Sequence, residues 1–184
     1  MKHPSNREFF AYWNGKREDA RAPGRRGVES GAVRGLLGDI FVLSCDAKAG
    51  YPFRLAGTRV CALFGCDLKD RSFSALFKGE SRSEIGEILT AVAEDMLPAV
   101  AGLISTTARG GCVHLELVLL PLNTRAYAPI SMTGLLAPFE AGAGGLGKLE
   151  LASHRYLHRA EKIVPRTLRK LAIPRGLMVY EGLR

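Results

Sequence analysis

Two apolar runs joined by a turn open the central part of the chain. DIFVLSCD (39–46) is rich in apolar residues, AKAGYP (47–52) contains turn formers, and FRLAG (53–57) is a second apolar run. Short apolar runs bounded by Gly and Pro are typical of β-strands joined by a tight connection. These residues therefore predict an antiparallel hairpin.

A second group of strands is predicted further along the chain. Three segments, 98–110, 112–122 and 130–138, have no helical period between them. In the middle segment His114 and Glu116 lie on one face, and the opposite face is apolar throughout. The apolar face consists of Val113, Leu115, Leu117 and Leu119. An antiparallel meander accounts for this pattern.

Helical periods occur on both sides of the hairpin. Ser5 and Glu8 have the spacing of a capping box, which predicts a helix from about 5 to 18. Apolar residues in 81–96 recur at i, i+3, i+4 and i+7, which predicts the clearest helix of the chain. Residues 72–77 predict a shorter helical turn. This turn and the helix of 81–96 lie between the hairpin and the meander in the sequence.

The segment FRLAGTRVCALFG (53–65) passes from a strand into a helix. Thr58 is a suitable N-cap, and Gly65 suits the left-handed residue that ends a helix of about two turns. The segment has neither the GxxxxGK[ST] pattern of a phosphate loop nor the GxSxG pattern of a nucleophile elbow. It therefore predicts framework, and we expect a protein that is not an enzyme, since no nucleophile–base pair or convergent carboxylate pair is evident.

The aromatic face of the first helix and a single arginine in a strand are the features of most interest. The first helix has an aromatic face that must pack on its own domain or on a second copy; it consists of Phe9, Phe10, Tyr12 and Trp13. Arg54 lies in an otherwise apolar strand, so it should point to solvent or pair with a carboxylate such as Glu116. If paired, Arg54 and Glu116 would form a polar switch.

Charge is concentrated at the two ends of the chain. The 184 residues carry a net charge of +8, and 47% of them are hydrophobic, which suits one globular domain with extensions. Residues 1–26 hold seven basic and three acidic residues, and residues 150–184 hold eight and three. These ends predict either solvated surface or arms for nucleic acid, an anionic membrane surface or an acidic protein.

The cysteines and the chain start favour a cytoplasmic protein. Four cysteines lack a CxxC pair, which indicates reduced thiols and neither a metal site nor a disulfide framework. No run reaches the ~18 apolar residues of a membrane span, and the start MKHPSNREFF does not resemble a secretion signal. His154 and His158 are four residues apart, but neighbouring arginines favour surface histidines over a metal site.

Several of these features together resemble short stand-alone bacterial PAS-domain proteins. The resemblance covers residues 5–138 and rests on short sequence motifs. They are Tyr12-Trp13, Ala22-Pro23 with the arginines that follow, the FVL of 41–43, the FRLAGT of 53–58 with Cys61 and the LFG of 63–65, and Glu116 with the LLPL of 119–122. The predicted element order is also that of a PAS fold.

The resemblance implies an α+β fold and a sensory or adaptor role. It implies a PAS-like five-stranded antiparallel sheet with helices on one face, an N-terminal helix and loop (1–38), a PAS domain (39–138), and a Gly-rich linker with a basic extension (139–184). It implies a regulatory module that senses a signal or binds a protein partner, and that dimerises through the aromatic helix. PAS domains hold a small molecule between sheet and helices, or hold none.

A small-ligand sensor and a nucleic-acid binder are the alternatives. The ligand cavity would be lined by Leu55, Cys61, Leu63, Phe64, Phe73, Phe77, Leu117 and Met132, which are also the residues of a filled core. The resemblance does not give the identity of a cofactor. Haem is disfavoured because 81–96 contains no His, and flavin because RVCALFG lacks the motif around a reactive Cys. Nucleic-acid binding would use Arg21, Arg25, Arg26 and the bases of 155–175.

Overall fold

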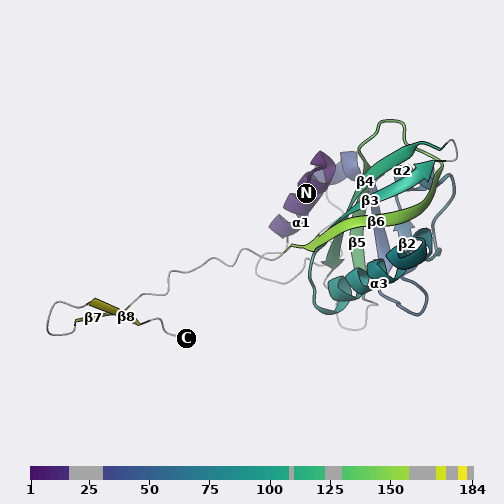
Figure 1. Cartoon of the computed structure of the whole chain (residues 1–184). Coiled ribbons are helices and arrows are strands. Elements are labelled where there is room, and N and C mark those ends of the chain that lie inside the picture. The colour runs from purple at the N-terminus through teal and green to yellow at the C-terminus, as the bar shows by residue number, and fades with distance from the viewer. Residues whose placement is uncertain (17–30, 108–109, 123–129, 158–168, 173–177, 182–184) are drawn as a thin grey trace.

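The computed structural model describes residues 1–16, 31–107, 110–122 and 130–157, and the backbone of two short strands, 169–172 and 178–181 (Figure 1). The arginines at 21, 25 and 26, His158 and most of the bases of 155–175 lie outside the described residues. The predictions made for these residues therefore stay predictions.

One antiparallel sheet forms the centre of the molecule. Its strands are β1 (Ile40–Ser44), β2 (Phe53–Ala56), β3 (Ala99–Thr107), β4 (Cys112–Leu122), β5 (Ser131–Pro138) and β6 (Leu146–Tyr156). They lie in the order β2-β1-β5-β4-β3-β6. The predicted hairpin and meander are confirmed, and the fold is α+β as predicted.

The sixth strand, β6, corrects the predicted five-stranded sheet. It pairs with β3 from Ala99↔Tyr156 to Thr107↔Leu146, so part of the segment predicted as linker and extension belongs to the sheet. Gly142 and Gly145 adopt positive φ and form the turn that brings the chain back after β5. Along β6 only Leu149, Glu150 and Leu151 alternate between apolar and polar residues, which is why its sequence pattern is weak. Two further strands, β7 (Arg169–Ala172) and β8 (Met178–Glu181), pair with each other.

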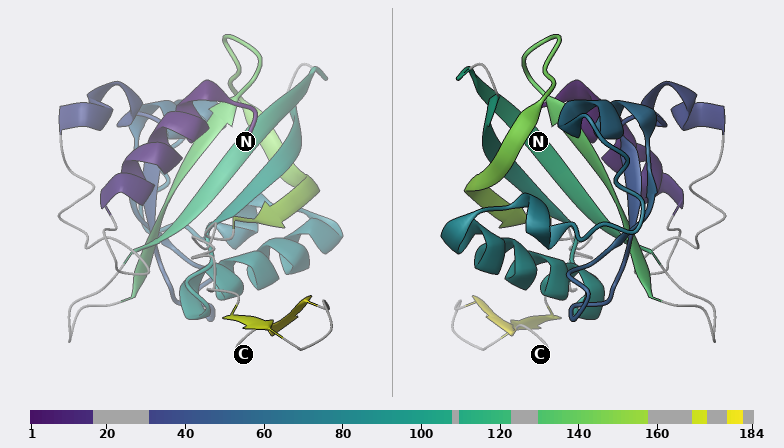
Figure 2. Two further views of the ribbon diagram at one scale, coloured as in Figure 1. Left: turned by 90° about the vertical axis from the view of Figure 1, so that its left-hand side faces the viewer. Right: turned by 90° about the vertical axis from the view of Figure 1, so that its right-hand side faces the viewer.

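Helices cover the two faces of the sheet unequally (Figure 2). α2 (Thr58–Phe64), the short 3₁₀ turn η3 (Ser74–Leu76) and α3 (Gly79–Glu94) lie on one face, which we call the inner face. α1 (Pro4–Lys16) lies on the other, outer face, and η2 (Gly31–Leu36) contacts it. The predicted ranges of the first and the clearest helix agree with α1 and α3 to within a few residues.

The start of α1 differs from the predicted capping box. His3 is the residue before the helix: its carbonyl accepts from the Arg7 N–H at 3.2 Å, and its ring Nδ1 accepts from the Ser5 N–H at 3.2 Å. Pro4 takes the first helical position, where its missing N–H costs nothing. Ser5 therefore lies inside the helix, and the Ser5–Glu8 capping box was wrong.

Gly57 is the N-cap of α2 because only a glycine fits there. The predicted N-cap, Thr58, is instead the first helical residue. A Cβ at Gly57 would overlap the carbonyl of Gly38 and lie 2.5 Å from the carbonyl oxygen of Leu37. Gly65 ends α2 with φ 66°, as predicted.

We expect Gly57→Ala to lower the free energy of unfolding by about 1–3 kcal/mol, because the added methyl group overlaps backbone that cannot move aside. The matched control is Gly86→Ala in α3, where a Cβ meets no atom within 4 Å. That substitution should raise the free energy of unfolding by about 0.5–1 kcal/mol through helix propensity. Urea denaturation of both variants checks the prediction, and equal stability of Gly57→Ala and wild type would contradict it.

Candidate functional site

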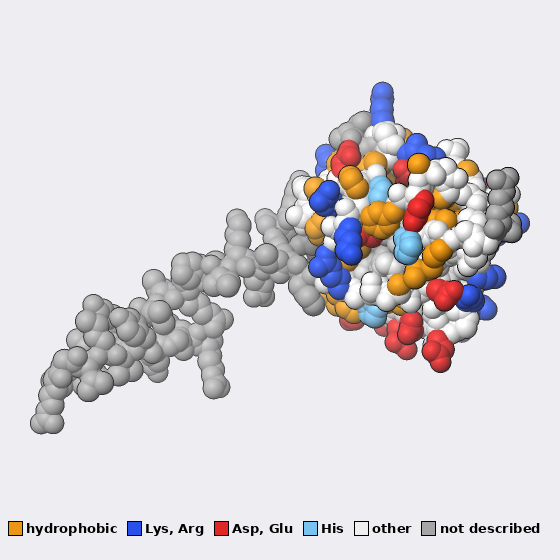
Figure 3. Space-filling view, turned by 45° about the horizontal axis from the view of Figure 1, so that its top comes forward, with side chains coloured by type: hydrophobic (Ala, Val, Ile, Leu, Met, Phe, Trp, Pro, Cys, Tyr) orange, Lys and Arg blue, Asp and Glu red, His pale blue; other side chains and the backbone are white. Residues whose placement is uncertain are grey.

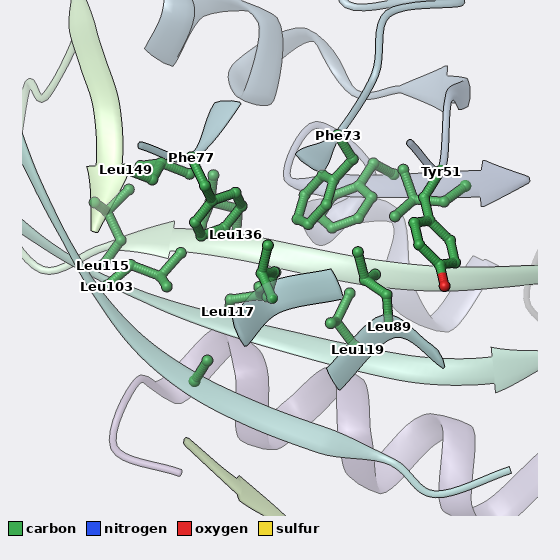
Figure 4. Packing of buried hydrophobic residues seen from close by; sticks show 14 of the residues in the cluster. Tyr51, Phe73, Phe77, Leu89, Leu103, Leu115, Leu117, Leu119, Leu136 and Leu149 are labelled. Carbon is green, nitrogen blue, oxygen red and sulfur yellow. The ribbon is translucent and has the colours of Figure 1, made fainter. Parts of the chain in front are cut away.

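The interior between the sheet and its inner-face helices was the predicted ligand cavity, and it is filled with side chains (Figure 4). Five of the predicted cavity residues are at most 5% exposed and belong to one packed core; they are Leu63, Phe73, Phe77, Leu117 and Met132. The ring centroid of Phe73 lies 5.4 Å from that of Phe41 and 5.5 Å from those of Phe53 and Phe77. Cys61 and Phe64 are half-buried at the margin of this core.

Leu55 does not belong to that interior, because its side chain is 51% exposed. The cause is an irregular register between β1 and β2: Val42 pairs with Leu55 and Leu43 pairs with Phe53, which leaves Arg54 as an extra residue. A bulge of this kind reverses the alternation of side chains along a strand. Phe53 therefore points into the core while Leu55 points to solvent, and the prediction for Leu55 was wrong.

Arg54 and Glu116 do not pair. Arg54 is exposed, which was one of its two predicted arrangements, whereas Glu116 is 6% exposed on the outer face of β4. The Glu116 carboxylate accepts hydrogen bonds from the backbone N–H of Lys2 at 2.6 Å and of His3 at 2.9 Å, and from the Asn6 amide at 3.1 Å. We call this arrangement the Glu116 clasp; it joins the start of α1 to the centre of the sheet.

The clasp keeps Glu116 ionised. Burial by itself raises the pKa of this carboxyl group, but the hydrogen bonds from Lys2, His3 and Asn6 outweigh burial and hold the pKa below its ordinary value. A buried carboxylate with three donors is a stable arrangement only while those donors remain in place. Glu116 therefore depends on the docking of α1, and α1 depends on Glu116.

The aromatic face of α1 packs on its own sheet. Phe9 and Trp13 are fully buried, and the Trp13 ring N–H donates to the carbonyl of Pro121 at 3.0 Å. The sheet residues beneath the helix are Ile40, Val118, Leu120, Leu135 and Ala137. Phe10 and Tyr12 are half-buried beside them, and Phe10 stacks on Trp13 with a centroid distance of 5.9 Å. Of the two predicted arrangements, Phe9 and Trp13 adopt the one within the domain.

Beside the start of α1, the outer face is hollowed into a groove of about 660 Å³. Val100, Gly102 and Ile104 of β3 line it, together with Ser153 and Arg155 of β6. The other lining residues are Met1, Lys2, Leu103, His114, Leu115, Glu116, Phe139, Glu140, Ala152 and His154. Figure 3 shows histidine side chains next to hydrophobic and acidic ones on one face of the molecule, the same mixture of types that lines this groove.

A second pair of hydrogen bonds fixes one wall of the groove. The Glu140 carboxylate accepts from the His114 backbone N–H at 2.9 Å and lies 2.9 Å from the His114 ring Nδ1. The hydrogen bond from the His114 side chain lowers the pKa of Glu140. Phe139, next to Glu140, packs edge-on against the ring of His3 with a centroid distance of 5.4 Å. Residues far apart in the sequence thus meet at this groove.

Three of the four thiols are partly buried, and Cys112 is exposed. Cys45, Cys61, Cys66 and Cys112 are all free, and burial raises the pKa of the Cys45 thiol to about 11, which keeps it protonated. Within the described ranges, no group of three or more His, Cys, Asp or Glu side chains is arranged to hold a metal ion. None of the described helices is long and apolar enough to cross a membrane.

Comparison with known proteins identifies a family and a set of similar folds. The family model described as "PAS domain" matches residues 1–137, which includes α1 and ends before β6. The LOV protein of Rhodobacter sphaeroides is 16% identical, with a TM-score of 0.43 over 59% of this chain and 66% of that one. The PAS domain of BvgS from Bordetella pertussis is 16% identical, with a TM-score of 0.45 over 60% and 83%.

A third similar structure is the PAS domain of the fruit-fly ELK potassium channel. It is 11% identical, with a TM-score of 0.45 over 58% of this chain and 90% of that one. The chain thus spans just under two thirds of the Rhodobacter sphaeroides protein and more of the other two. A search of curated protein sequences finds no match.

Proposed function

This chain belongs to the PAS domain family, and on that premise we propose that it is a non-catalytic regulatory module that relays a binding event through α1. PAS domains are signal-sensing modules of regulators and photoreceptors. Here the interior is occupied by packed side chains, so the surface that can respond to a partner is the outer face. α1 covers one part of that face and the groove lies open beside it.

The docking of α1 carries this proposal. Two buried aromatic side chains and the Glu116 clasp hold α1 on the sheet. All of these contacts are lost at once when the helix leaves the sheet. Undocking exposes Val118, Leu120 and Leu135, which form an apolar surface on the sheet. A helix with a docked and an undocked position is a two-state element whose balance a partner can shift.

A homodimer belongs to the same proposal. Phe10 and Tyr12 lie at the exposed margin of α1, where a second copy can pack without displacing Phe9 or Trp13. The cytoplasmic location and a protein partner likewise remain predictions. The small-ligand alternative is not favoured by the packed interior, and the nucleic-acid alternative depends on basic segments that lie mostly outside the described residues.

Native-state hydrogen exchange tests whether α1 is a two-state element. The amides of α1 should exchange through an opening that needs clearly less free energy than global unfolding, whereas those of α3, which pack in the inner core, should exchange only with the whole domain. Light scattering over a range of concentrations tests the homodimer. Exchange of α1 only through global unfolding would contradict the proposed relay.

A further inference from the structure

Among the described residues, no segment pairs with the outer half of β6 beyond β3, so this half-strand is a sheet edge. Ala152, Ser153, His154 and Arg155 are all exposed, although successive residues of a strand point to opposite faces. Ser153 and Arg155 lie on one face and His154 on the other, so this half-strand is exposed on both faces. An edge strand presents unpaired N–H and C=O groups that can bind another strand.

The inner half of β6, by contrast, has its edge occupied. The Lys78 N–H donates to the Leu149 carbonyl at 3.1 Å, and the Leu151 N–H donates to the Ser81 hydroxyl at 3.0 Å. In the described part of the chain, no backbone group of Ala152–Tyr156 has a comparable partner beyond β3. The open stretch is thus limited to about five residues, or about 16 Å of strand.

A register shift turns this edge toward the groove. Gly102 pairs with Ser153 and Leu103 pairs with Leu151, so Ala152 is an extra residue in β6. Leu151 consequently packs against the inner core, while Ser153 and Arg155 line the groove on the outer face. The open edge and the groove therefore form one continuous surface, with Val100 and Ile104 as its apolar floor.

The charge of this surface favours an acidic occupant. Arg155 and Lys2 line the groove, and neither forms an ion pair with another described residue. The carboxylates of Glu116 and Glu140 are already hydrogen-bonded within the protein. A second copy would bring a further net charge of +8 to a surface that already carries Arg155, whereas an acidic segment compensates it.

We propose that an extended acidic segment of a partner protein adds to β6 as a new strand along Ala152–Tyr156. Main-chain hydrogen bonds hold the segment, one face of its alternating side chains fills the groove, and a carboxylate on that face pairs with Arg155. The inference rests on the proposed function as a partner-binding module. The strand that carries it lies outside residues 1–137, the part that matches the family.

The test uses a fluorescent peptide of eight alternating valine and aspartate residues and the full-length protein. Fluorescence anisotropy should detect binding, and Arg155→Glu should weaken it at least about tenfold, the change expected for a charge pair reversed at close range. Arg54→Glu is the matched control, because Arg54 is exposed on β2 at the opposite edge of the sheet, and it should change the affinity less than about twofold.

Two further peptides, N-methylated on one or the other alternate set of residues, test strand addition itself. One set faces β6 and should lose binding, and the other set should retain it. No binding of the unmodified peptide, equal binding to Arg155→Glu, or equal loss from both methylated peptides would overturn the proposal. A concentration-dependent dimer that Arg155→Glu abolishes would assign the edge to a second copy and overturn it as well.

The two proposals fail separately. If the unmodified peptide does not bind the wild-type protein while α1 opens locally, only the strand-addition inference is contradicted. Peptide binding together with an α1 that opens only on global unfolding contradicts only the relay through α1.

Discussion

Phe73→Ala should lower the free energy of unfolding by about 3–5 kcal/mol, as measured by urea denaturation. Phe73 is 1% exposed and its ring packs against those of Phe41, Phe53 and Phe77. Removing the ring loses its transfer free energy and leaves a cavity that neighbouring rings cannot close completely. The effect is large because the Phe73 ring contacts three other aromatic rings inside the packed core.

Leu55→Ala is the matched control for Phe73→Ala. Both residues were predicted to line the same cavity, but Leu55 is exposed, so its substitution should change the stability by less than about 0.5 kcal/mol. Mass spectrometry of the denatured wild-type protein should detect no released small molecule. A released molecule, or a cost for Phe73→Ala close to that of Leu55→Ala, would contradict the filled core and restore the small-ligand sensor.

Glu116→Leu should undock α1 and lower the stability by about 2–4 kcal/mol, because each buried donor left without an acceptor costs about 1–3 kcal/mol. The Lys2 and His3 N–H groups lose their acceptor in this variant, whereas the Asn6 amide loses one hydrogen bond and keeps its 2.9 Å bond to the backbone carbonyl of residue 116. Trp13 is the only tryptophan and is fully buried between α1, to which it belongs, and the sheet, so its emission reports the docking directly. The emission should shift to the red, and acrylamide should quench it more.

The control is Glu94→Leu, which replaces an exposed carboxylate at the end of α3 and should leave Trp13 emission unchanged. Acid provides an independent check. Since the pKa of Glu116 is lower in the folded than in the unfolded chain, its stabilisation is complete above the ordinary Glu pKa of about 4.3 and disappears as the pH falls through the folded value. Trp13 should therefore become more exposed in wild type as the pH falls below the ordinary Glu pKa and through the lower folded one, and an identical acid profile in Glu116→Gln would count against the clasp.

Local periodicity was enough to predict most of the sheet. The hairpin and the meander have clear alternation, and both appear in the structure with the predicted order. Leu55 failed because one extra residue, Arg54, reverses the alternation, and a bulge leaves no mark in the pattern of apolar residues. β6 was missed for a related reason: its outer half is polar on both faces, so it does not alternate.

The contacts of the outer face depended on information that one sequence does not contain. Glu116 was identified as a notable carboxylate, but its partners, two backbone N–H groups and the Asn6 amide, lie more than a hundred residues away, and no spacing rule connects them. The aromatic residues of α1 indicated a packed face without saying which surface covers it. Among the predicted site residues, the structure brings Glu116, Phe9 and Trp13 to one face of the sheet, while Arg54 lies apart from them.

The main-chain character of the clasp sets which positions can vary without harm. Two of the three hydrogen-bond donors to Glu116 are backbone N–H groups, which every residue except proline supplies. These two hydrogen bonds therefore do not depend on the side chains of Lys2 and His3. Homologues that retain the clasp should therefore differ freely at position 2 but never carry proline there, whereas the acid at 116 and the amide at 6 should change only together. Sequence drift at the amino terminus would then leave the attachment of the helix intact.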